Sequence, residues 1–210
     1  MKSYFYDLFS LYKSLFLNFN WANKESYGNY LAQTYYYVSH SSRIMSIVAG
    51  HMPAEHEETH KAILHHALEE RGHQFAAKKD LERLGYKLSN FPELSETRMF
   101  WEPQYYKAQF SPLDFYGYAL MLEGTAVLLG PKILEIIENI HGTRVSGFIR
   151  LHCEEDPAHF DGLFKLFDKF NEQELSGIQI NCEQSFKAFQ NILQATVGEK
   201  SSSKGASHAA

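Results

Sequence analysis

The sequence predicts an all-α protein of about seven helices. Three observations support this class. Apolar residues recur at three- and four-residue spacing through most of the 210-residue chain, typical helix-start and helix-stop residues bound these stretches, and helical signals far outnumber strand signals. A chain of this length most often forms one domain. We therefore expect a helical domain over residues 1–198 and a disordered tail over residues 199–210, where small polar residues follow no pattern.

Composition narrows the functional classes. Apolar residues make up 44% and charged residues 21% of the chain, as in soluble globular proteins. A net charge of −5 without a basic block argues against nucleic acid as the main partner. The apolar runs are too short to span a bilayer. Cys153 and Cys182 form neither a CxxC pair nor a disulfide framework, so we expect a cytoplasmic protein.

The aromatic segment over residues 1–21 is predicted to be an amphipathic helix. Asp7 and Lys13 interrupt its apolar residues, and no small-residue cleavage site follows, so it does not read as a signal peptide. We expect this helix to pack on the body of the protein or in a homodimer contact.

Four helices should follow, over residues 24–50, 53–84, 96–110 and 112–141. Pro53 suits the first position of a helix, and Gly85 is a natural stop after the second of these segments. Ser111 as a capping residue followed by Pro112 is a strong start for the fourth.

Two further helices complete the chain. Thr143 is the expected cap of the first, and Pro157 should kink it. Asn171 with Glu174 makes a capping arrangement for the last helix, which should end near residue 198.

The helix after Thr143 carries metal-type side chains on one face. His152, Asp156 and His159 stand at i, i+4 and i+7, and the apolar Phe148 and Leu163 share their side. Neutral imidazole and ionised carboxylate are good metal ligands, and neighbouring helical turns bring them together. The alternative is a solvated helix face on which the spacing is accidental.

A second such face lies in the expected helix over residues 53–84. His66, Glu70 and His73 stand at i, i+4 and i+7, with Glu69 as a competing carboxylate one position round the helix. A Glu-x-x-His turn is the spacing that metal sites in helical bundles use. The alternative is an exposed polar face.

Glu123 is the third feature, because it is the only charged residue within residues 115–130. A carboxylate in such a run is expected to be buried, and a buried carboxylate must be paired, protonated or bound to metal. The alternative to a metal is an arginine partner, for which Arg71, Arg144 or Arg150 could serve.

Together these segments offer three carboxylates and three imidazoles, a set that suits two divalent ions. The six residues are Glu70, His73, Glu123, His152, Asp156 and His159. Their arrangement resembles the haem-oxygenase-like diiron oxidases and oxygenases, which are related in fold to the thiaminase-like proteins and to the pyrroloquinoline quinone synthase. The resemblance covers roughly residues 29–170 and implies a haem-oxygenase-like bundle. It also implies that Glu123 bridges or caps one iron, while His152, Asp156 and His159 divide between the two.

The sequence departs from this family on the first ligand helix. Several members place a carboxylate two turns before the histidine, where this chain has His66. We therefore take Glu70 as the ligand that accompanies His73. His66 is left either as an additional nitrogen ligand or as a residue outside the ligand shell.

The resemblance implies two Fe²⁺ ions, with Fe/Mn as an alternative, and O₂ as co-substrate. The substrate would be a small organic molecule of the amine, amino acid or fatty acid type, and an external electron donor could be needed. Members of the family can also oxidise one of their own tyrosines. Tyrosines that precede the first ligand helix are Tyr27, Tyr30, Tyr35, Tyr36 and Tyr37.

Three rival functions are weighed against this one. A haem oxygenase needs an axial histidine near the N-terminus, and His40 is the earliest. A thiaminase-like hydrolase would use Cys153 as nucleophile, but this residue turns about 100° away from His152 on a helix. A non-enzymatic binding or effector module could keep a vestigial metal site.

Overall fold

The computed structural model describes residues 1–197, and these residues form nine α-helices and no strand. The helices are α1 (Lys2–Leu17), α2 (Lys24–Val38), α3 (Ser41–His51), α4 (Glu57–Glu69), α5 (Gln74–Arg83), α6 (Ser95–Phe110), α7 (Phe115–His141), α8 (Gly147–Phe167) and α9 (Glu172–Thr196). Short 3-10 turns lie at η1 (Ala54–His56), η2 (Leu88–Asn90), η3 (Pro112–Asp114) and η4 (Thr143–Val145). The predicted all-α class is confirmed, and the expected tail, residues 199–210, lies outside the described residues.

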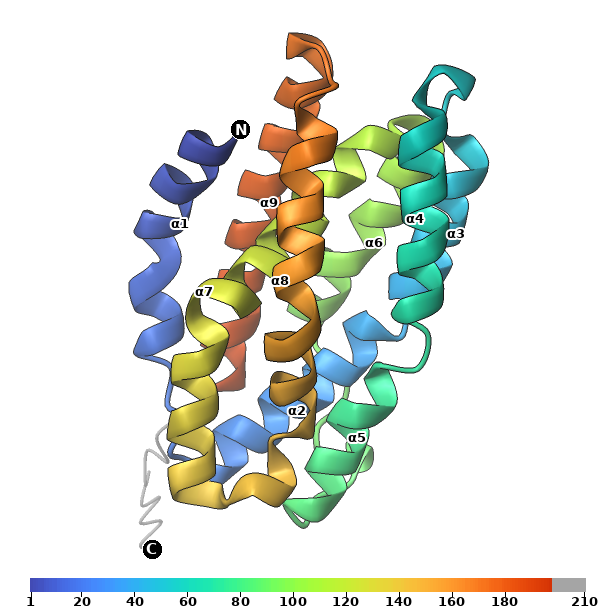
Figure 1. Cartoon of the computed structure of the whole chain (residues 1–210). Coiled ribbons are helices and arrows are strands. Elements are labelled where there is room, and N and C mark those ends of the chain that lie inside the picture. Colours follow the sequence, from blue (N-terminus) through green and yellow to red (C-terminus); the bar gives the residue numbers. More distant parts are fainter. Residues whose placement is uncertain (198–210) are drawn as a thin grey trace, which may run out of the picture.

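The bundle is organised around α7, which packs on both α8 and α9. Figure 1 shows α8 and α9 running along the middle of the molecule, with α1 on one side and α3 and α4 on the other. Most of the first half of α7 is buried, including Tyr118, Leu120 and Met121. No helix within residues 1–197 combines the length and apolar character needed to cross a membrane.

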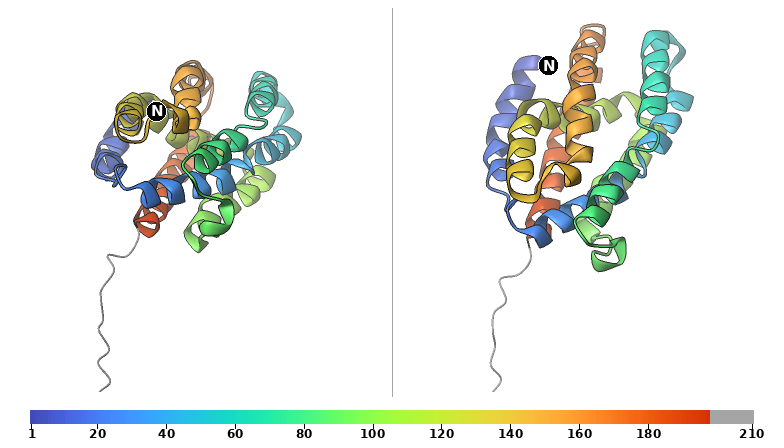
Figure 2. Two further views of the ribbon diagram at one scale, coloured as in Figure 1. Left: turned by 90° about the horizontal axis from the view of Figure 1, so that it is seen from below. Right: turned by 60° about the horizontal axis from the view of Figure 1, so that its bottom comes forward.

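The N-terminal helix packs on the body of the protein, which is one of the two arrangements expected from the sequence. Phe5 and Phe16 on α1 are buried, and Phe16 stacks on Phe189 of α9 with ring centroids 5.4 Å apart. Both views of Figure 2 place α1 at the outer edge of the bundle. The apolar face of this amphipathic segment is thereby removed from water, which stabilises the fold.

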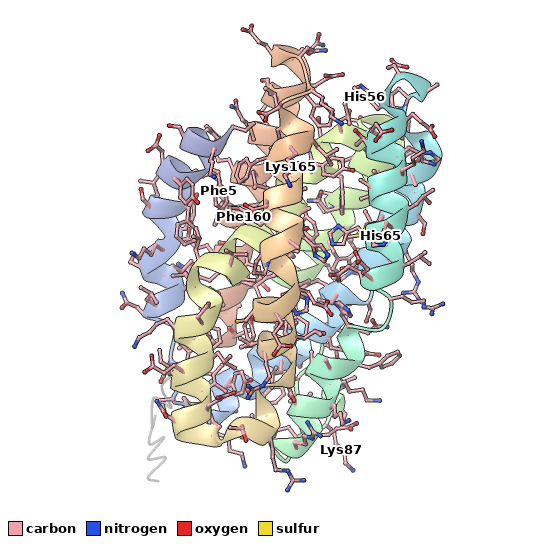
Figure 3. All side chains as sticks on the ribbon, in the orientation of Figure 1. Phe5, His56, His65, Lys87, Phe160 and Lys165 are labelled. Carbon is pink, nitrogen blue, oxygen red and sulfur yellow. The ribbon has the colours of Figure 1, made fainter. Side chains whose placement is uncertain are left out.

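One glycine lets α1 and α8 approach the middle of α7. A methyl group on Gly124 would lie 2.2 Å from the Phe5 ring and 2.8 Å from the Phe160 ring. Figure 3 shows these two labelled phenylalanines pointing toward one another, and their ring centroids are 5.4 Å apart. A larger side chain at this position would force the aromatic pair apart.

Two of the expected helices are each divided in two, so the described residues hold nine α-helices rather than about seven. The segment over residues 24–50 breaks at Ser39 and His40, between α2 and α3. There the Ser39 hydroxyl donates a hydrogen bond to the Tyr35 carbonyl at 2.6 Å. Such a side-chain hydrogen bond competes with continuation of the helix.

The segment over residues 53–84 is likewise two helices, α4 and α5, joined by a turn. Gly72 in this turn has a φ of +104°, a left-handed conformation that glycine adopts without strain. The expectation of one continuous helix carrying His66, Glu70 and His73 was therefore wrong. Glu70 is the residue that follows the last turn of α4, and His73 is the residue that precedes α5, so both belong to the turn between the two helices.

Expected helix starts at Pro53, Pro112 and Thr143 were a few residues early, because each of these residues leads into a 3-10 turn. The ligand-bearing helix α8 is capped by a distant residue instead. The Asp80 carboxylate, from α5, accepts a hydrogen bond from the Phe148 backbone N–H at 2.7 Å. This bond ties the start of α8 to α5.

The last helix begins as the sequence predicts. The Asn171 side chain accepts hydrogen bonds from the backbone N–H groups of Gln173 and Glu174, and the Glu174 side chain reaches back to the Asn171 N–H. The predicted capping arrangement is confirmed. Helix α9 then runs to Thr196, close to its predicted end.

Candidate metal centre

The candidate ligands come from three parts of the bundle. Helix α7 contributes Glu123, near the middle of its length. Helix α8 contributes its three residues from its central turns. The end of α4 and the turn into α5 contribute the remaining residues. These positions are far apart in sequence, and the packing of α8 on α7 and on α5 brings them into one region.

Six donor side chains form two compact groups, in each of which the ligand atoms lie within 4.8 Å of one another. The first group is His66, Glu123 and His159. The second group is Glu70, His73 and His152. Each group therefore combines one carboxylate with two imidazoles. Each also combines a histidine from α8 with a residue from α4 or from the turn after it. Glu70 and not Glu69 is the carboxylate of the second group.

Asp156 belongs to neither group but lies beside both. It is 2% exposed, and its Oδ1 lies 3.8 Å from Nδ1 of His159 in the first group. In the second group, the charge of Glu70 is one of the influences that raise the pKa of Asp156. The two groups also approach one another directly, since Nε2 of His66 lies 3.6 Å from Glu123 and 3.8 Å from Glu70.

Several of these donor atoms make no hydrogen bond within the described residues. Nδ1 of His73, Nδ1 of His159 and both carboxylate oxygens of Glu123 are buried and make no hydrogen bond. Leaving such polar atoms buried and unsatisfied costs several kcal/mol for a set of this size. A divalent cation in each group would give these atoms a partner. The residues present therefore fit metal ions of the class that imidazole and carboxylate ligands bind.

The three inner carboxylates have very different pKa values in the metal-free protein. Burial, and then the charges of Asp156 and Glu70, raise the pKa of Glu123 well above its usual range. Burial, and then the charges of Glu70 and Glu155, raise the pKa of Asp156 to about 8. Burial also raises the pKa of Glu70, but the imidazoles of His66 and His73 beside it lower that pKa by more. Among these three carboxylates, the negative charge therefore rests on Glu70.

The backbone determines which nitrogen of His152 faces the centre. Nδ1 of His152 lies 2.9 Å from the Phe148 carbonyl oxygen of the preceding turn. Because a carbonyl oxygen only accepts hydrogen bonds, Nδ1 carries the proton and Nε2 carries the free electron pair. Burial lowers the pKa of this histidine. A neutral imidazole with one nitrogen held by a hydrogen bond is the form in which histidine binds metals.

No arginine pairs with Glu123 in the part of the chain that the structure describes. The ion-pair partner of its carboxylate is His66, whereas Arg150 pairs with Glu138. The arginine-paired alternative for Glu123 was therefore wrong.

The centre forms one wall of a cavity of about 110 Å³. Five of the candidate ligands reach this cavity: His66, Glu70, Glu123, His152 and Asp156. The other walls are mostly aromatic and aliphatic, with Phe16, Trp21, Tyr30, Tyr37, Met45, Tyr118, Ile133, Ile149 and Phe189 among them. Neither lysine nor arginine lines it within residues 1–197. The cavity therefore suits the apolar part of a small molecule.

The residues on which two of the rival functions depend, His40 and Cys153, lie in surroundings that do not suit those functions. His40 stacks on Trp101 with ring centroids 3.6 Å apart, and its Nδ1 lies 2.8 Å from the Tyr105 hydroxyl, so it is not among the residues that line the cavity. Burial raises the pKa of the Cys153 thiol to about 11. A thiol with such a pKa is a poor nucleophile near neutral pH.

Sequence reasoning left the role of His66 open, and the structure places it in the first group. The signal was present in the sequence, because His66 precedes Glu70 by one helical turn. Its partnership with Glu123 rather than with His73 depends on how α4 packs against α7 and α8, which local spacing does not reveal.

Comparisons with known proteins agree with this description. Residues 28–184 match the model of a family described as iron-containing redox enzymes. The solved structure of a domain of unknown function with a heme oxygenase-like fold, from Shewanella denitrificans OS217, superposes with a TM-score of 0.81. Its sequence is 18% identical, and the match covers 90% of this chain and 88% of that one. The fold is therefore haem-oxygenase-like. No curated protein sequence matches the chain.

Proposed function

The chain belongs to the family of iron-containing redox enzymes, and we propose that it is a non-haem diiron oxidase or oxygenase that uses O₂ to oxidise a small organic substrate. One observation carries the proposal. Two groups of imidazole and carboxylate donors face a single cavity region, and four of their buried atoms have no hydrogen-bond partner among residues 1–197. Two adjacent sites of this composition suit a dinuclear iron centre.

In this proposal His66, Glu123 and His159 hold one ion, and Glu70, His73 and His152 hold the other. Asp156 lies beside both groups and is available to either ion. The chemistry that such a centre supplies when loaded is the activation of dioxygen. Fe/Mn stays the alternative to Fe/Fe, and we propose that an external electron donor restores the reduced state.

The chain must release protons when the centre is loaded. In the metal-free protein Asp156 holds a proton up to a pH of about 8, and the raised pKa of Glu123 keeps that carboxyl protonated as well. Both groups must ionise to act as ligands. Metal binding should therefore tighten as the pH rises.

The cavity limits the substrate to a molecule with an apolar portion. Within residues 1–197 no lysine or arginine lines the cavity to pair with a substrate carboxylate, and the polar side chains on its walls other than the ligands are few. An amine, an amino acid or a fatty acid would therefore place its hydrocarbon part against the aromatic walls. Its reactive end would lie at the wall that carries the metal ligands.

Oxidation of one of the protein's own tyrosines is a second candidate function. Tyr30, Tyr37 and Tyr118 line the cavity together with the ligands. The Tyr118 hydroxyl is buried and has no hydrogen-bond partner among the described residues, whereas the Tyr27 hydroxyl donates to the Val145 carbonyl at 2.7 Å. Tyr118 was not among the tyrosines that the sequence singled out.

The test is anaerobic reconstitution with Fe²⁺ followed by metal analysis. We expect two irons per chain in the wild type. His152→Ala, Asp156→Ala and His159→Ala should each lose at least one metal and keep the helical circular-dichroism spectrum. A folded wild type without metal would contradict the proposal and favour a binding or effector module. Unchanged stoichiometry in all three variants would contradict the assignment of these residues as ligands.

Exposure of the loaded protein to O₂ then separates the two candidate functions. Mass spectrometry should detect oxidised product from an amine, amino acid or fatty acid supplied with the protein. A mass change confined to the chain, and abolished in Tyr118→Phe, would instead favour oxidation of the protein's own tyrosine.

A further inference from the structure

Two histidines of the candidate centre have the same unusual arrangement. In both His73 and His159, Nδ1 is buried and has no hydrogen-bond partner among the described residues. Nδ1 of each also belongs to the inner side of the centre, 3.3 Å from Glu70 for His73 and 3.8 Å from Asp156 for His159. The other ring nitrogen, Nε2, therefore points away from the centre.

Two segments carry these histidines: α8, and the end of α4 with the turn that follows it. In each case a carboxylate from the other segment lies close to Nε2 of the histidine. Nε2 of His159, on α8, lies 3.2 Å from Glu69 at the end of α4. Nε2 of His73, in the turn after α4, lies 3.6 Å from Glu155 on α8. The two contacts cross, since each segment supplies a carboxylate for a histidine of the other.

This crossing explains two acidic doublets in the sequence, Glu69-Glu70 and Glu155-Asp156. Adjacent residues on a helix point about 100° apart. One member of each doublet can therefore face the centre while the other reaches its rim. The side chains of Glu70 and Asp156 are 10% and 3% exposed, whereas those of Glu69 and Glu155 are 39% and 41% exposed.

We propose that Glu69 and Glu155 are positioning residues of the metal centre, Glu69 for His159 in the first group and Glu155 for His73 in the second. In this role Glu69, 3.2 Å from Nε2 of His159, accepts the proton of that nitrogen. Glu155, 3.6 Å from Nε2 of His73, accepts the corresponding proton after a small side-chain movement. Nδ1 of each histidine then carries the free electron pair that faces the metal. Carboxylates that act in this way orient the ring and make it a stronger ligand. The inference rests on the proposed function, because it assumes that both groups bind metal.

The alternative is a pair of ordinary surface contacts. Glu69 has a competing neighbour in His65, whose Nδ1 lies 3.1 Å from the same carboxylate oxygen, and His65 is labelled on α4 in Figure 3. Contacts between half-exposed charges add little to stability. A merely superficial role therefore predicts that removal of Glu69 or Glu155 leaves metal affinity unchanged.

The experiment measures Co²⁺ binding by the metal-free full chain in two backgrounds that each keep one group. His73→Ala retains the first group, and His159→Ala retains the second. Co²⁺ is followed by titration calorimetry and by its visible absorption. We expect Glu69→Ala to weaken binding 10- to 100-fold in the His73→Ala background, the range typical for loss of such a supporting group, and to have no effect in the His159→Ala background.

Glu155→Ala should show the reverse pattern, with its effect only in the His159→Ala background. The matched control is Glu154→Ala, since Glu154 is an exposed neighbour on α8 and should leave the affinity unchanged in both. Glu69→Gln and Glu155→Gln keep an acceptor oxygen and should recover part of the lost affinity. Thermal melts of the metal-free variants should agree with their parents within a few degrees.

The outcomes separate this inference from the proposed function. Equal effects in both backgrounds, or effects no larger than that of Glu154→Ala, would overturn the positioning role while leaving the metal centre intact. A wild-type chain that binds no Co²⁺ would overturn both. A background that loses all Co²⁺ binding while the wild type binds two ions would overturn the independent division of ligands on which the crossed assignment depends.

Discussion

At the scale of single residues, Glu123 combines deep burial with the lack of a lysine or arginine partner in the described chain. Its exposed fraction is 5%, and both of its oxygens are unsatisfied. The group beside it that can carry a positive charge is the His66 imidazole, whose Nε2 lies 3.6 Å from Oε1 of Glu123. Burial holds its pKa well above the usual range, so the metal-free protein carries a neutral carboxyl group at a cost in stability.

Glu123→Leu should therefore produce a metal-free protein at least as stable as the wild type, because it removes a buried polar group and roughly conserves volume. The same variant should lose the rise in melting temperature that Fe²⁺ gives to the wild type. Thermal melts under anaerobic conditions, with and without Fe²⁺, measure both effects. A metal-free variant destabilised by about 3–5 kcal/mol would mean that Glu123 is one half of a buried ion pair after all.

Asp156 should make stability depend on pH. Its pKa is about 8 in the folded protein and about 3.9 in an unfolded chain, so folding favours the protonated form. Its contribution to stability is fully present below a pH of about 4 and is lost as the pH rises to about 8. The loss is about 1.4 kcal/mol for each pH unit between the two values.

Asp156→Asn cannot ionise, so its stability relative to the wild type should grow by several kcal/mol between pH 5 and pH 8. Urea denaturation of both metal-free proteins, in the presence of a chelator, gives this difference directly. Other groups titrate in both proteins and cancel in the comparison. A difference that stays constant with pH would show that Asp156 is already ionised at pH 5.

At the scale of helices, the decisive features are where α4 stops and where α8 starts. The turn at Gly72 redirects the chain between the two helices, so that Glu70 and His73, at its two ends, both belong to the second group. The start of α8 is held by Asp80 through its bond to the Phe148 N–H. The carbonyl of that same residue, Phe148, orients His152. Asp80 thus helps to position His152 through the backbone of Phe148.

Asp80→Ala should destabilise the metal-free protein by roughly 1–3 kcal/mol, because it leaves a buried backbone N–H without an acceptor at a helix start. Asp80→Asn keeps an acceptor oxygen and should cost less. Equilibrium denaturation of the two variants provides the comparison. Equal losses in both would show that the carboxylate charge, rather than the cap, stabilises α8.

At the scale of the whole molecule, the candidate ligands tie together segments that are distant in sequence. The first group joins α4, α7 and α8, and the second joins the α4–α5 turn to α8. A metal that binds these groups only in the folded protein stabilises the entire bundle by mass action. At a hundredfold excess over Kd the gain is about 2.7 kcal/mol for each site.

For a chain of this size such a gain corresponds to a rise in melting temperature of roughly 5–10 °C for each site. Addition of Fe²⁺ to the metal-free protein should produce this rise, and a chelator should reverse it. The double variant His73→Ala/His159→Ala lacks one nitrogen in each group and serves as the control. An equal rise in the control would place the stabilising ions elsewhere on the protein.

The sequence alone determined the helical class and the candidate ligands that share one helix. The face that holds His152, Asp156 and His159 depends only on helical periodicity, which is a local property. The burial of Glu123 followed in the same way from the apolar run around it. The capping arrangement at Asn171 was equally local, since all of its partners lie within three residues.

Tertiary structure decided which side chains meet across helices. The break between α4 and α5, the pairing of His66 with Glu123, and the capping of α8 by Asp80 rather than by Thr143 all depend on contacts between distant segments. The roles of Glu69 and Glu155 depend on which ring nitrogen of each histidine faces inward. Spacing along one helix specifies a direction from its axis, whereas a metal site requires distances between atoms on different helices, and only packing determines those distances.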